Sequence, residues 1–313
     1  MFNRRFLRIK IMQALYAYFR DEKADATMAE KTLFTSIDKS YELFLYLLSF
    51  LNNLQFVARI SIEEARVKKL PTEQDLNPNT KFVNNLFLTA LNENKQINDA
   101  WKSYKVSWQN DQDLVRKVYN EIKGTDFFKE YMQSKEQSFT EDKKFIQTIL
   151  ESFLYEHELF NFWFDEKNIY WNDDYYYGFY FLSNWMDIVS ESKMPSPKTF
   201  RDETDDKKFI SELFLKTILH SNEFEEMIIE HTKNWELERI ASLDVLLMKM
   251  TLTEIVYLQN VPIKVSMNEY IEITKEYSTP QSGGFINGIL DKIVIELKSQ
   301  NKIQKAGRGL LES

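Results

Sequence analysis

The chain has no cysteine among its 313 residues, and only 3 histidines, 7 glycines and 6 prolines. Without cysteine it forms neither disulfide bonds nor thiolate-ligated metal sites. An all-β fold needs many turns, so the shortage of glycine and proline favours helices. The histidines are scattered, and none lies in a His-Glu-x-x-His pair or in the Glu-x-x-His spacing of helical di-iron sites. We therefore expect an all-α protein that is not an enzyme and holds no metal or cofactor.

The sequence also lacks a long apolar run. The best run, Leu43 to Leu51, is far shorter than the roughly 20 residues that a membrane-spanning helix needs. The cationic start is followed by apolar residues, but Arg8, Lys10 and Gln13 interrupt them, which argues against a signal peptide. We therefore expect a soluble, cytoplasmic protein with no membrane partner.

The net charge of -8 by itself disfavours nucleic acid as a partner. The distribution of charge changes this interpretation. Residues 1–20 carry a net charge of +5 and residues 298–313 carry +3, so the rest of the chain is strongly acidic. If the two basic ends meet in space, they form one basic patch on an acidic body.

The region from Trp235 to Leu297 contains the clearest helical pattern. Apolar spacing and turn residues predict three helices, at residues 242–258, 266–277 and 285–297. Pro262 ends the first helix, because the residue before a proline is disfavoured in the helical region. Ser266 and Glu269 have the spacing of a capping box, which places the second helix start at Ser266. Nothing in this region has catalytic spacing, so it is typical of a binding module.

Residues 4–19 predict a further helix with a buried stripe of Leu7, Ile11 and Leu15. Its arginines lie on another face, with Arg4 and Arg8 one turn apart. Such a face is either a surface for RNA phosphates or an ordinary solvated surface. Charge alone favours the solvated surface.

Both regions resemble one protein family. The run at 261–265 (Val-Pro-Ile-Lys-Val), with Asn268-Glu269 and Lys275 after it, resembles the C-terminal half of the NusB family of bacterial transcription antitermination factors. So does the run at 285–291 (Phe-Ile-Asn-Gly-Ile-Leu-Asp) with the preceding Ser282. The N-terminal pattern Arg-Arg-x-x-Arg at 4–8, with Gln-Ala-Leu-Tyr at 13–16, resembles the family's arginine-rich first helix. The resemblance covers about the first fifth and the last third of the chain.

The resemblance implies a pair of helical bundles, of which the N-terminal one is enlarged here. We predict four parts: N-terminal NusB-like helices at 1–59, an acidic, aromatic-rich helical insertion at 60–201, the last helix of the N-terminal bundle within 202–234, and a C-terminal bundle with a basic tail at 235–313. A single amphipathic helix over residues 209–231 is expected in the third part.

The insertion contains a dense aromatic cluster at residues 162–181, which invites a base-stacking interpretation. Asp165, Glu166, Asp173 and Asp174 are interleaved with the rings, and no arginine is present. These carboxylates would repel a phosphate backbone. Helix packing or a protein contact is therefore the better interpretation.

The family resemblance implies binding to boxA RNA of ribosomal RNA operons together with the ribosomal protein NusE, and indirect contact with other Nus factors and RNA polymerase. The residues we expect at the RNA are Arg4, Arg5, Arg8, Gln13, Lys264, Lys275, Ser282, Phe285, Asn287 and Lys292. Those we expect to face NusE are Tyr16, Asp244 and, with a structural role as its alternative, Glu254. Gly288 is expected to mark a close contact between helices, because a glycine inside a helix costs about 1 kcal/mol relative to alanine.

The turn at Gln281-Ser282-Gly283-Gly284 is glycine-rich and precedes a helix, but it lacks the Gly-Lys-Ser/Thr ending of a nucleotide-binding P-loop. A helix start with unpaired amides can still hold an RNA phosphate. Many relatives carry polar or basic residues at Gly283 and Gly284 and an acid at Gln281, so this turn has fewer cations. Two alternatives stay open. One is a purely protein-binding scaffold. The other is a relative of the RNA-binding domain of ribosomal RNA cytosine methyltransferases, although the chain has no glycine-rich βαβ cofactor motif.

Overall fold

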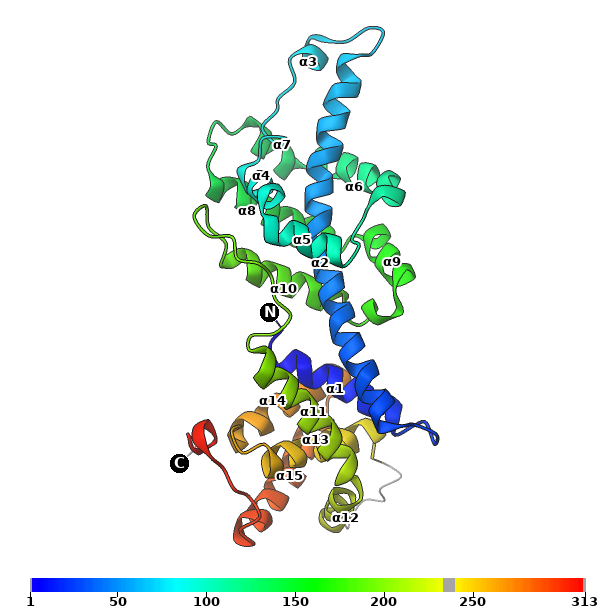
Figure 1. The fold of residues 1–313 in the computed structure, drawn as a ribbon, viewed down its shortest axis with the longest axis vertical. Helices are drawn as coiled ribbons and strands as arrows, with labels where there is room; N and C mark the ends of the chain where they lie inside the picture. The colour runs from blue at the N-terminus through cyan, green and yellow to red at the C-terminus, as the bar shows by residue number, and fades with distance from the viewer. Residues whose placement is uncertain (1, 233–239, 312–313) are drawn as a thin grey trace. The chain divides into compact units, whose positions relative to one another are not determined.

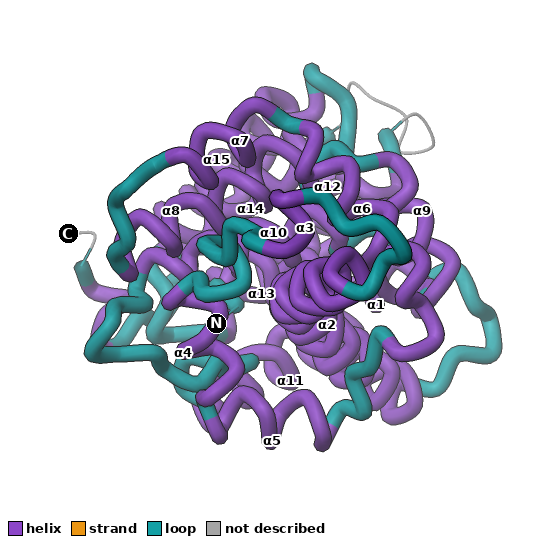
Figure 2. Tube along the Cα trace, turned by 90° about the horizontal axis from the view of Figure 1, so that it is seen from above, coloured by secondary structure: helices purple, strands orange, loops and turns teal. Residues whose placement is uncertain are grey.

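The computed structural model describes residues 2–232 and 240–311. Within these residues the regular structure is helical, and the only strand-like pairing is an isolated bridge between Ser190 and Lys193 (Figure 1, Figure 2). The prediction of an all-α protein is confirmed. The expected start of the C-terminal region at Trp235, and the boundary between residues 234 and 235, lie outside the described residues.

The chain forms two compact units. We call Asp38–Thr199 the central unit, and Phe2–Ile37 together with Phe200–Ser313 the terminal unit. The long helix α2 (Ala26–Arg66) contributes residues to both. These two units are separated by the contacts within the fold. The predicted insertion at 60–201 is instead the part of the chain for which we expect no counterpart in short members of the family. The insertion boundaries therefore stay a prediction.

The terminal unit is built around α13 (Ser242–Tyr257). Its other helices are α1 (Arg4–Tyr18), α11 (Glu203–Leu219), α12 (Ser221–His231), α14 (Ile263–Tyr277), α15 (Ser282–Ser299) and the 3-10 turn η5 (Gly307–Leu310). α13 contacts α1, α11, α12, α14 and α15. Every residue from 246 to 255 is buried. α13 is therefore a central helix covered on all sides.

Three helix boundaries differ from the sequence predictions. α14 begins at Ile263, directly after Pro262, so Ser266 lies inside the helix and does not cap it. α15 begins at Ser282, and both glycines of the turn lie in its first turn. The single helix expected at 209–231 is two helices that meet at His220. The helices at residues 4–18 and 242–257 agree closely with their predictions.

The segment after α15 is fixed against the C-terminal end of α13. The Nζ atom of Lys305 donates to the carbonyls of Glu254 and Leu258, at 3.3 and 3.1 Å. The Ala306 amide donates to the Gln259 carbonyl at 3.1 Å. Gly309 packs so closely that a Cβ atom there would lie 2.0 Å from the Gln259 carbonyl oxygen. Lys305 thus adds a second donor to two carbonyls that also accept the amides of Leu258 and Val261.

Substituting Gly309→Ala should detach this segment, because the added methyl group meets a backbone atom that cannot rotate away. We expect faster hydrogen exchange at the Ala306 amide and a loss of about 1–3 kcal/mol for an overpacked site. The control is Gly288→Ala, since a Cβ there has no neighbour within 4 Å. The close helix contact predicted at Gly288 is therefore wrong. Unchanged exchange at Ala306 in the Gly309 variant would contradict the expected detachment.

The central unit packs a set of short helices on α2. They are α3 (Glu73–Leu76), α4 (Leu86–Glu93), α5 (Lys95–Ser103), the 3-10 turn η1 (Gln109–Asp111), α6 (Gln112–Gly124), α7 (Asp126–Gln133), α8 (Phe139–Ile149), the π-helical turn η2 (Leu150–Leu154), α9 (Glu158–Lys167), η3 (Ile169–Trp171) and α10 (Tyr175–Asp187). Trp108, Phe160, Phe164 and Trp171 are almost fully buried and contact one another ring to ring. Gly178 of α10 lies directly against Leu43 and Leu47 of α2. Most of the aromatic residues therefore serve helix packing.

By length and composition alone, α2 is able to cross a membrane. It has 41 residues, with an 18-residue window of mean hydropathy 1.4, so the expectation that no segment is long enough is wrong. However, 72% of that window is buried inside the protein. This burial is typical of a core helix, because a membrane-spanning helix would present its apolar side chains to lipid.

Candidate nucleic-acid interface

Arg5 lies on the solvent side of the contact between α1 and α14. Its Nε and Nη2 atoms donate to the two carboxylate oxygens of Glu269, at 3.0 and 2.9 Å. The side chain remains 40% exposed. A guanidinium held in this way is fixed in position and still accessible to an anion.

Lys275 lies on the same surface, toward the C-terminal end of α14. Its ammonium group is 2.6 Å from Glu272 and its side chain is 62% exposed. The hydrogen bond and charge of Lys275 lower the pKa of Glu272, and the charge of Arg5 contributes in the same direction. Glu269, Glu272 and Lys275 follow one another at intervals of three residues on α14, so Arg5 and Lys275 lie along one side of that helix.

The first turn of α15 adjoins Lys275. A Cβ atom on Gly283 would lie 3.9 Å from Ile271 and 4.0 Å from the Cγ atom of Lys275. The first amides of a helix have no carbonyl partner within it and carry a partial positive charge. We call Arg5, Lys275, Gly283 and Gly284 the α14 strip. It brings together an arginine of the first helix and the glycine-rich helix start, which the sequence places almost 280 residues apart.

Arg8, in contrast, is part of the core. Its guanidinium donates to Glu254 of α13 at 2.8 and 2.6 Å, and both side chains are almost completely buried. The Ser266 hydroxyl, at 2.7 Å, and the Tyr270 hydroxyl, at 3.2 Å, donate to the same carboxylate. The Ser266 hydroxyl therefore belongs to a buried network and not to the capping box predicted from the sequence.

Two opposing effects set the pKa values of this pair. Burial alone would lower the pKa of Arg8, but the charge of Glu254 and the hydrogen bonds to it outweigh burial and raise that pKa. Burial alone would raise the pKa of Glu254. The charge of Arg8 and the hydrogen bonds from Arg8, Ser266 and Tyr270 outweigh it, so this pKa lies below its ordinary value of 4.5. Both groups are therefore ionised, and each compensates the buried charge of the other.

The remaining predicted residues of α1 face in other directions. Arg4 pairs with Asp205 and Asp206 of α11, at 2.7 and 2.8 Å, and its guanidinium lies over the Phe209 ring. Gln13 is half-buried. Arg4 thus pairs with α11, Arg5 with α14, and Arg8 with both α13 and α14, where its Nη1 atom lies 3.7 Å from Glu269. Of the three, Arg5 is the one in the α14 strip.

The buried Ser282 and Asp244 hold the turn between α14 and α15. Asp244 accepts hydrogen bonds from Ser278 at 2.5 Å and from Ser282 at 2.7 Å. Both Asp244 and Ser282 are about 95% buried. The Ser282 hydroxyl predicted for RNA is therefore occupied by the protein, and its role in this structure is to fix the start of α15. Sequence reasoning missed Ser278, since a lone serine in a turn carries no signal of its own.

The residues predicted to face a protein partner are Tyr16, Asp244 and Glu254, and they have different surroundings. The Arg20 guanidinium lies 4.3 Å from the centre of the Tyr16 ring and donates to Ser242 at 3.0 Å. Asp244 follows two residues later in the first turn of α13. Glu254 lies ten residues further along that helix, about 15 Å away, within the buried Arg8 network. Tyr16 thus lies near the first residue of α13, whereas Asp244 is buried with Ser278 and Ser282, and Glu254 is buried with Arg8.

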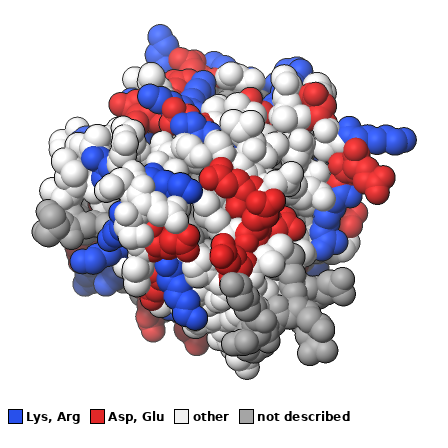
Figure 3. Space-filling model, turned by 90° about the horizontal axis from the view of Figure 1, so that it is seen from below, with Lys and Arg blue, Asp and Glu red and all other residues white. Residues whose placement is uncertain are grey.

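The other predicted RNA residues lie on α14 and α15. Lys264 and Lys292 are exposed, whereas Phe285 and Asn287 are half-buried. The amide of Asn287 donates to Asp291 at 3.1 Å, one turn later on α15. Basic and acidic side chains are interspersed on the face that Figure 3 shows. An anion must therefore bind at fixed cations, because no unbroken basic field covers this face.

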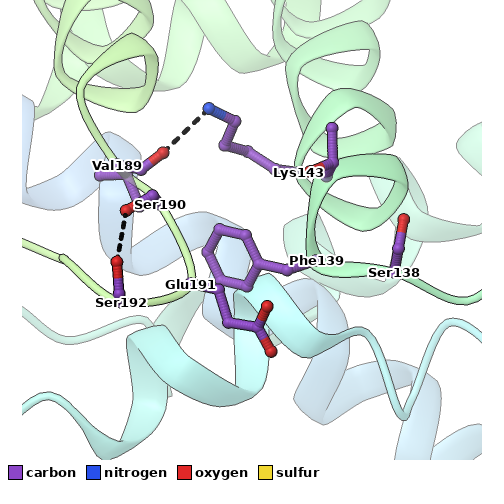
Figure 4. Close-up of a pocket in the computed structure, with 8 residues that line it drawn as sticks. Ser138, Phe139, Lys143, Val189, Ser190, Glu191 and Ser192 are labelled. Atoms are coloured by element: carbon purple, nitrogen blue, oxygen red, sulfur yellow. Dashed lines mark hydrogen bonds between the residues drawn. The ribbon is translucent and has the colours of Figure 1, made fainter.

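A separate open cavity of about 510 Å³ lies in the central unit between the start of α8 and the segment after α10 (Figure 4). Its cation, Lys143, donates to the carbonyls of Met186 and Val189, at 3.1 and 3.0 Å. Lys143 thus caps α10. Among the described residues, no group of three or more His, Asp or Glu side chains is placed to hold a metal ion.

Comparison with known proteins links the second half of the chain to one family. The family model described as "NusB family" matches residues 182–294, from within α10 to within α15. The transcription antitermination protein NusB of Salinibacter ruber is 45% identical over 105 residues, which cover 34% of this chain and 66% of that protein. The protein of the same name from Chloroherpeton thalassium is 44% identical over 106 residues, covering 34% and 50%. That of Thermodesulfovibrio yellowstonii is 38% identical over 99 residues, covering 32% and 66%. This chain therefore spans between half and about two thirds of the length of these relatives, and no solved structure matches it.

Proposed function

Because residues 182–294 of this chain belong to the NusB family, we propose that the protein is a non-catalytic transcription antitermination factor that binds RNA with its terminal unit. Its RNA is boxA of ribosomal RNA operons, and its protein partner on that RNA is NusE. The protein acts in the cytoplasm, where other Nus factors and RNA polymerase are engaged indirectly. The relatives carry the name of an antitermination protein, which agrees with this proposal.

The observation that supports RNA binding is the α14 strip. Arg5 and Lys275 are exposed cations held in place by carboxylates on one helix, and the first turn of α15 adjoins them. Two glycines in that turn let a phosphate approach the helix amides closely. The strip thus presents positive charge, fixed donor positions and an open helix start to the phosphates of a single strand.

Within this proposal, the predicted residues take different roles. Arg5 and Lys275 contact phosphates, and the exposed Lys264 and Lys292 add charge nearby. Arg8 and Ser282 act indirectly, since their polar groups are occupied inside the protein. Tyr16 and its neighbours at the start of α13 form the surface for NusE.

The proposal predicts that fluorescently labelled boxA RNA binds the full-length chain more tightly when NusE is present. Anisotropy titrations at several salt concentrations measure both affinity and the number of phosphate contacts. A scrambled RNA of equal length is the control. Equal affinity for boxA and scrambled RNA, with and without NusE, would contradict the proposal and leave the protein-binding scaffold as the better description.

A further inference from the structure

A row of exposed tyrosines lies on the central unit. All of them precede residue 182, where the match to the family model begins. Tyr155 follows η2, and Tyr176 and Tyr180 are one turn apart on α10. Their exposed fractions are 38%, 50% and 51%. The ring centres of Tyr155 and Tyr176 are 4.9 Å apart. These three residues therefore form one continuous surface, which we call the tyrosine surface.

Helix packing does not explain this surface. Tyr175 and Phe179, their neighbours on α10, are buried at 1% and 5% exposure and supply the contacts of the core. Tyr176 and Tyr180 lie on the exposed side of the same helix. Large aromatic side chains exposed together are a feature of protein interfaces, where tyrosine is enriched.

Carboxylates accompany the tyrosines. Glu151 lies one turn before Tyr155 and accepts a hydrogen bond at 2.9 Å from Ser183, which follows Tyr180 on α10. Glu156 is exposed directly beside Tyr155. From residue 151 to residue 190 the chain has eight Asp and Glu residues and a single cation, Lys167. Glu151 and Glu156, beside the rings, repel a phosphate backbone and attract a cation.

We propose that the tyrosine surface binds an arginine-rich segment of a partner protein. A guanidinium stacks on an aromatic face and pairs with carboxylates in the same plane, so it satisfies both features of the surface at once. A lysine ammonium pairs with the carboxylates but stacks less well, which makes arginine the preferred cation. This interaction is independent of RNA binding by the terminal unit, because it uses other residues of another unit.

The test is isothermal titration of the full-length protein with a short synthetic peptide of alternating arginine and serine. The Tyr176→Ser/Tyr180→Ser variant removes the rings and leaves the charge unchanged. We expect it to weaken peptide binding roughly tenfold, and a lysine-for-arginine peptide to bind more weakly to the unmodified protein. Tyr176→Phe/Tyr180→Phe keeps the aromatic faces and should restore binding. Glu151→Gln should weaken it through the lost carboxylate.

The matched control is Phe56→Ser, which removes another half-exposed aromatic ring from the central unit. It should leave peptide affinity unchanged, and circular dichroism should show intact helices in every variant. Equal peptide affinity in the tyrosine-to-serine variant would mean that the acidic chain attracts any polycation, which overturns the proposal. The proposal is also overturned if that variant loses affinity for labelled single-stranded RNA, since the surface would then bind nucleic acid.

Discussion

Substituting Glu254→Ala should lower the free energy of unfolding by about 3–5 kcal/mol, the range for breaking a buried ion pair from one side. The substitution leaves the Arg8 guanidinium in the core with no carboxylate to compensate its charge. The hydroxyls of Ser266 and Tyr270 lose the acceptor that they share. Denaturant unfolding followed by circular dichroism measures the loss.

An exposed ion pair, Lys275–Glu272, supplies the control. Glu272→Ala removes the carboxylate beside Lys275 at the surface, where solvent screens the pair and its removal should change the stability little. Because the folded-state pKa of Glu254 is lowered, its contribution is complete above the ordinary value of 4.5 and is lost as the pH falls through the folded-state pKa. The Glu254 variant should lack this part of the acid sensitivity. Equal losses in the two variants would refute the role of Glu254 as the acceptor of a buried cation.

The largest effect on RNA binding is expected from the double substitution Arg5→Ala/Lys275→Ala. Each cation that neutralises a phosphate of a single strand adds about 0.7 to the slope of log affinity against log salt. The double variant should therefore lower that slope by about 1.4 and weaken binding most at low salt. Anisotropy titration with labelled boxA RNA over a salt series measures both quantities.

The matched control is Lys69→Ala/Lys117→Ala, which removes the same charge from exposed positions of the central unit. If the two double variants lower the salt slope equally, the RNA responds to net charge and the α14 strip is not its site. Both variants should melt close to the unmodified protein, because surface ion pairs contribute little to stability. Unchanged melting temperatures would show that a weaker RNA affinity comes from lost RNA contacts and not from unfolding.

The sequence predicted well those helices that have a regular apolar spacing or end at a clear turn. The helix at residues 4–18 has a regular apolar spacing, and the one at 242–257 ends at a proline-containing turn. The capping box at Ser266 failed for a physical reason. Pro262 already supplies an extended residue before the helix, so the helix begins at Ile263. The Ser266 hydroxyl then lies inside the helix and donates to the buried Glu254 carboxylate.

The functional surface was harder to predict, because charge patterns do not show which cations are buried. Arg5 and Arg8 are alike in sequence, yet one is 40% exposed and the other 3%. The difference lies in Glu254, which is 246 residues away from Arg8 in the sequence. A partner so distant in the sequence can be identified only from the tertiary structure. The family resemblance identified the region, and the contacts distinguish the residues that reach solvent from those that support them.

The Arg8–Glu254 pair also bears on how the chain folds during synthesis. α1 is synthesised before the central unit, but its contacts are with α11, α13 and α14, which follow that unit in the chain. The complete sequence of the central unit is synthesised before any of these partners. Since domains generally fold as units in the order of their synthesis, α1 waits with an unpaired Arg8 while Asp38–Thr199 folds. Closing the terminal unit then requires contacts of very large sequence separation, which are intrinsically slow to form. A chaperone that acts on this protein would therefore meet an exposed amphipathic N-terminal helix beside an already folded unit.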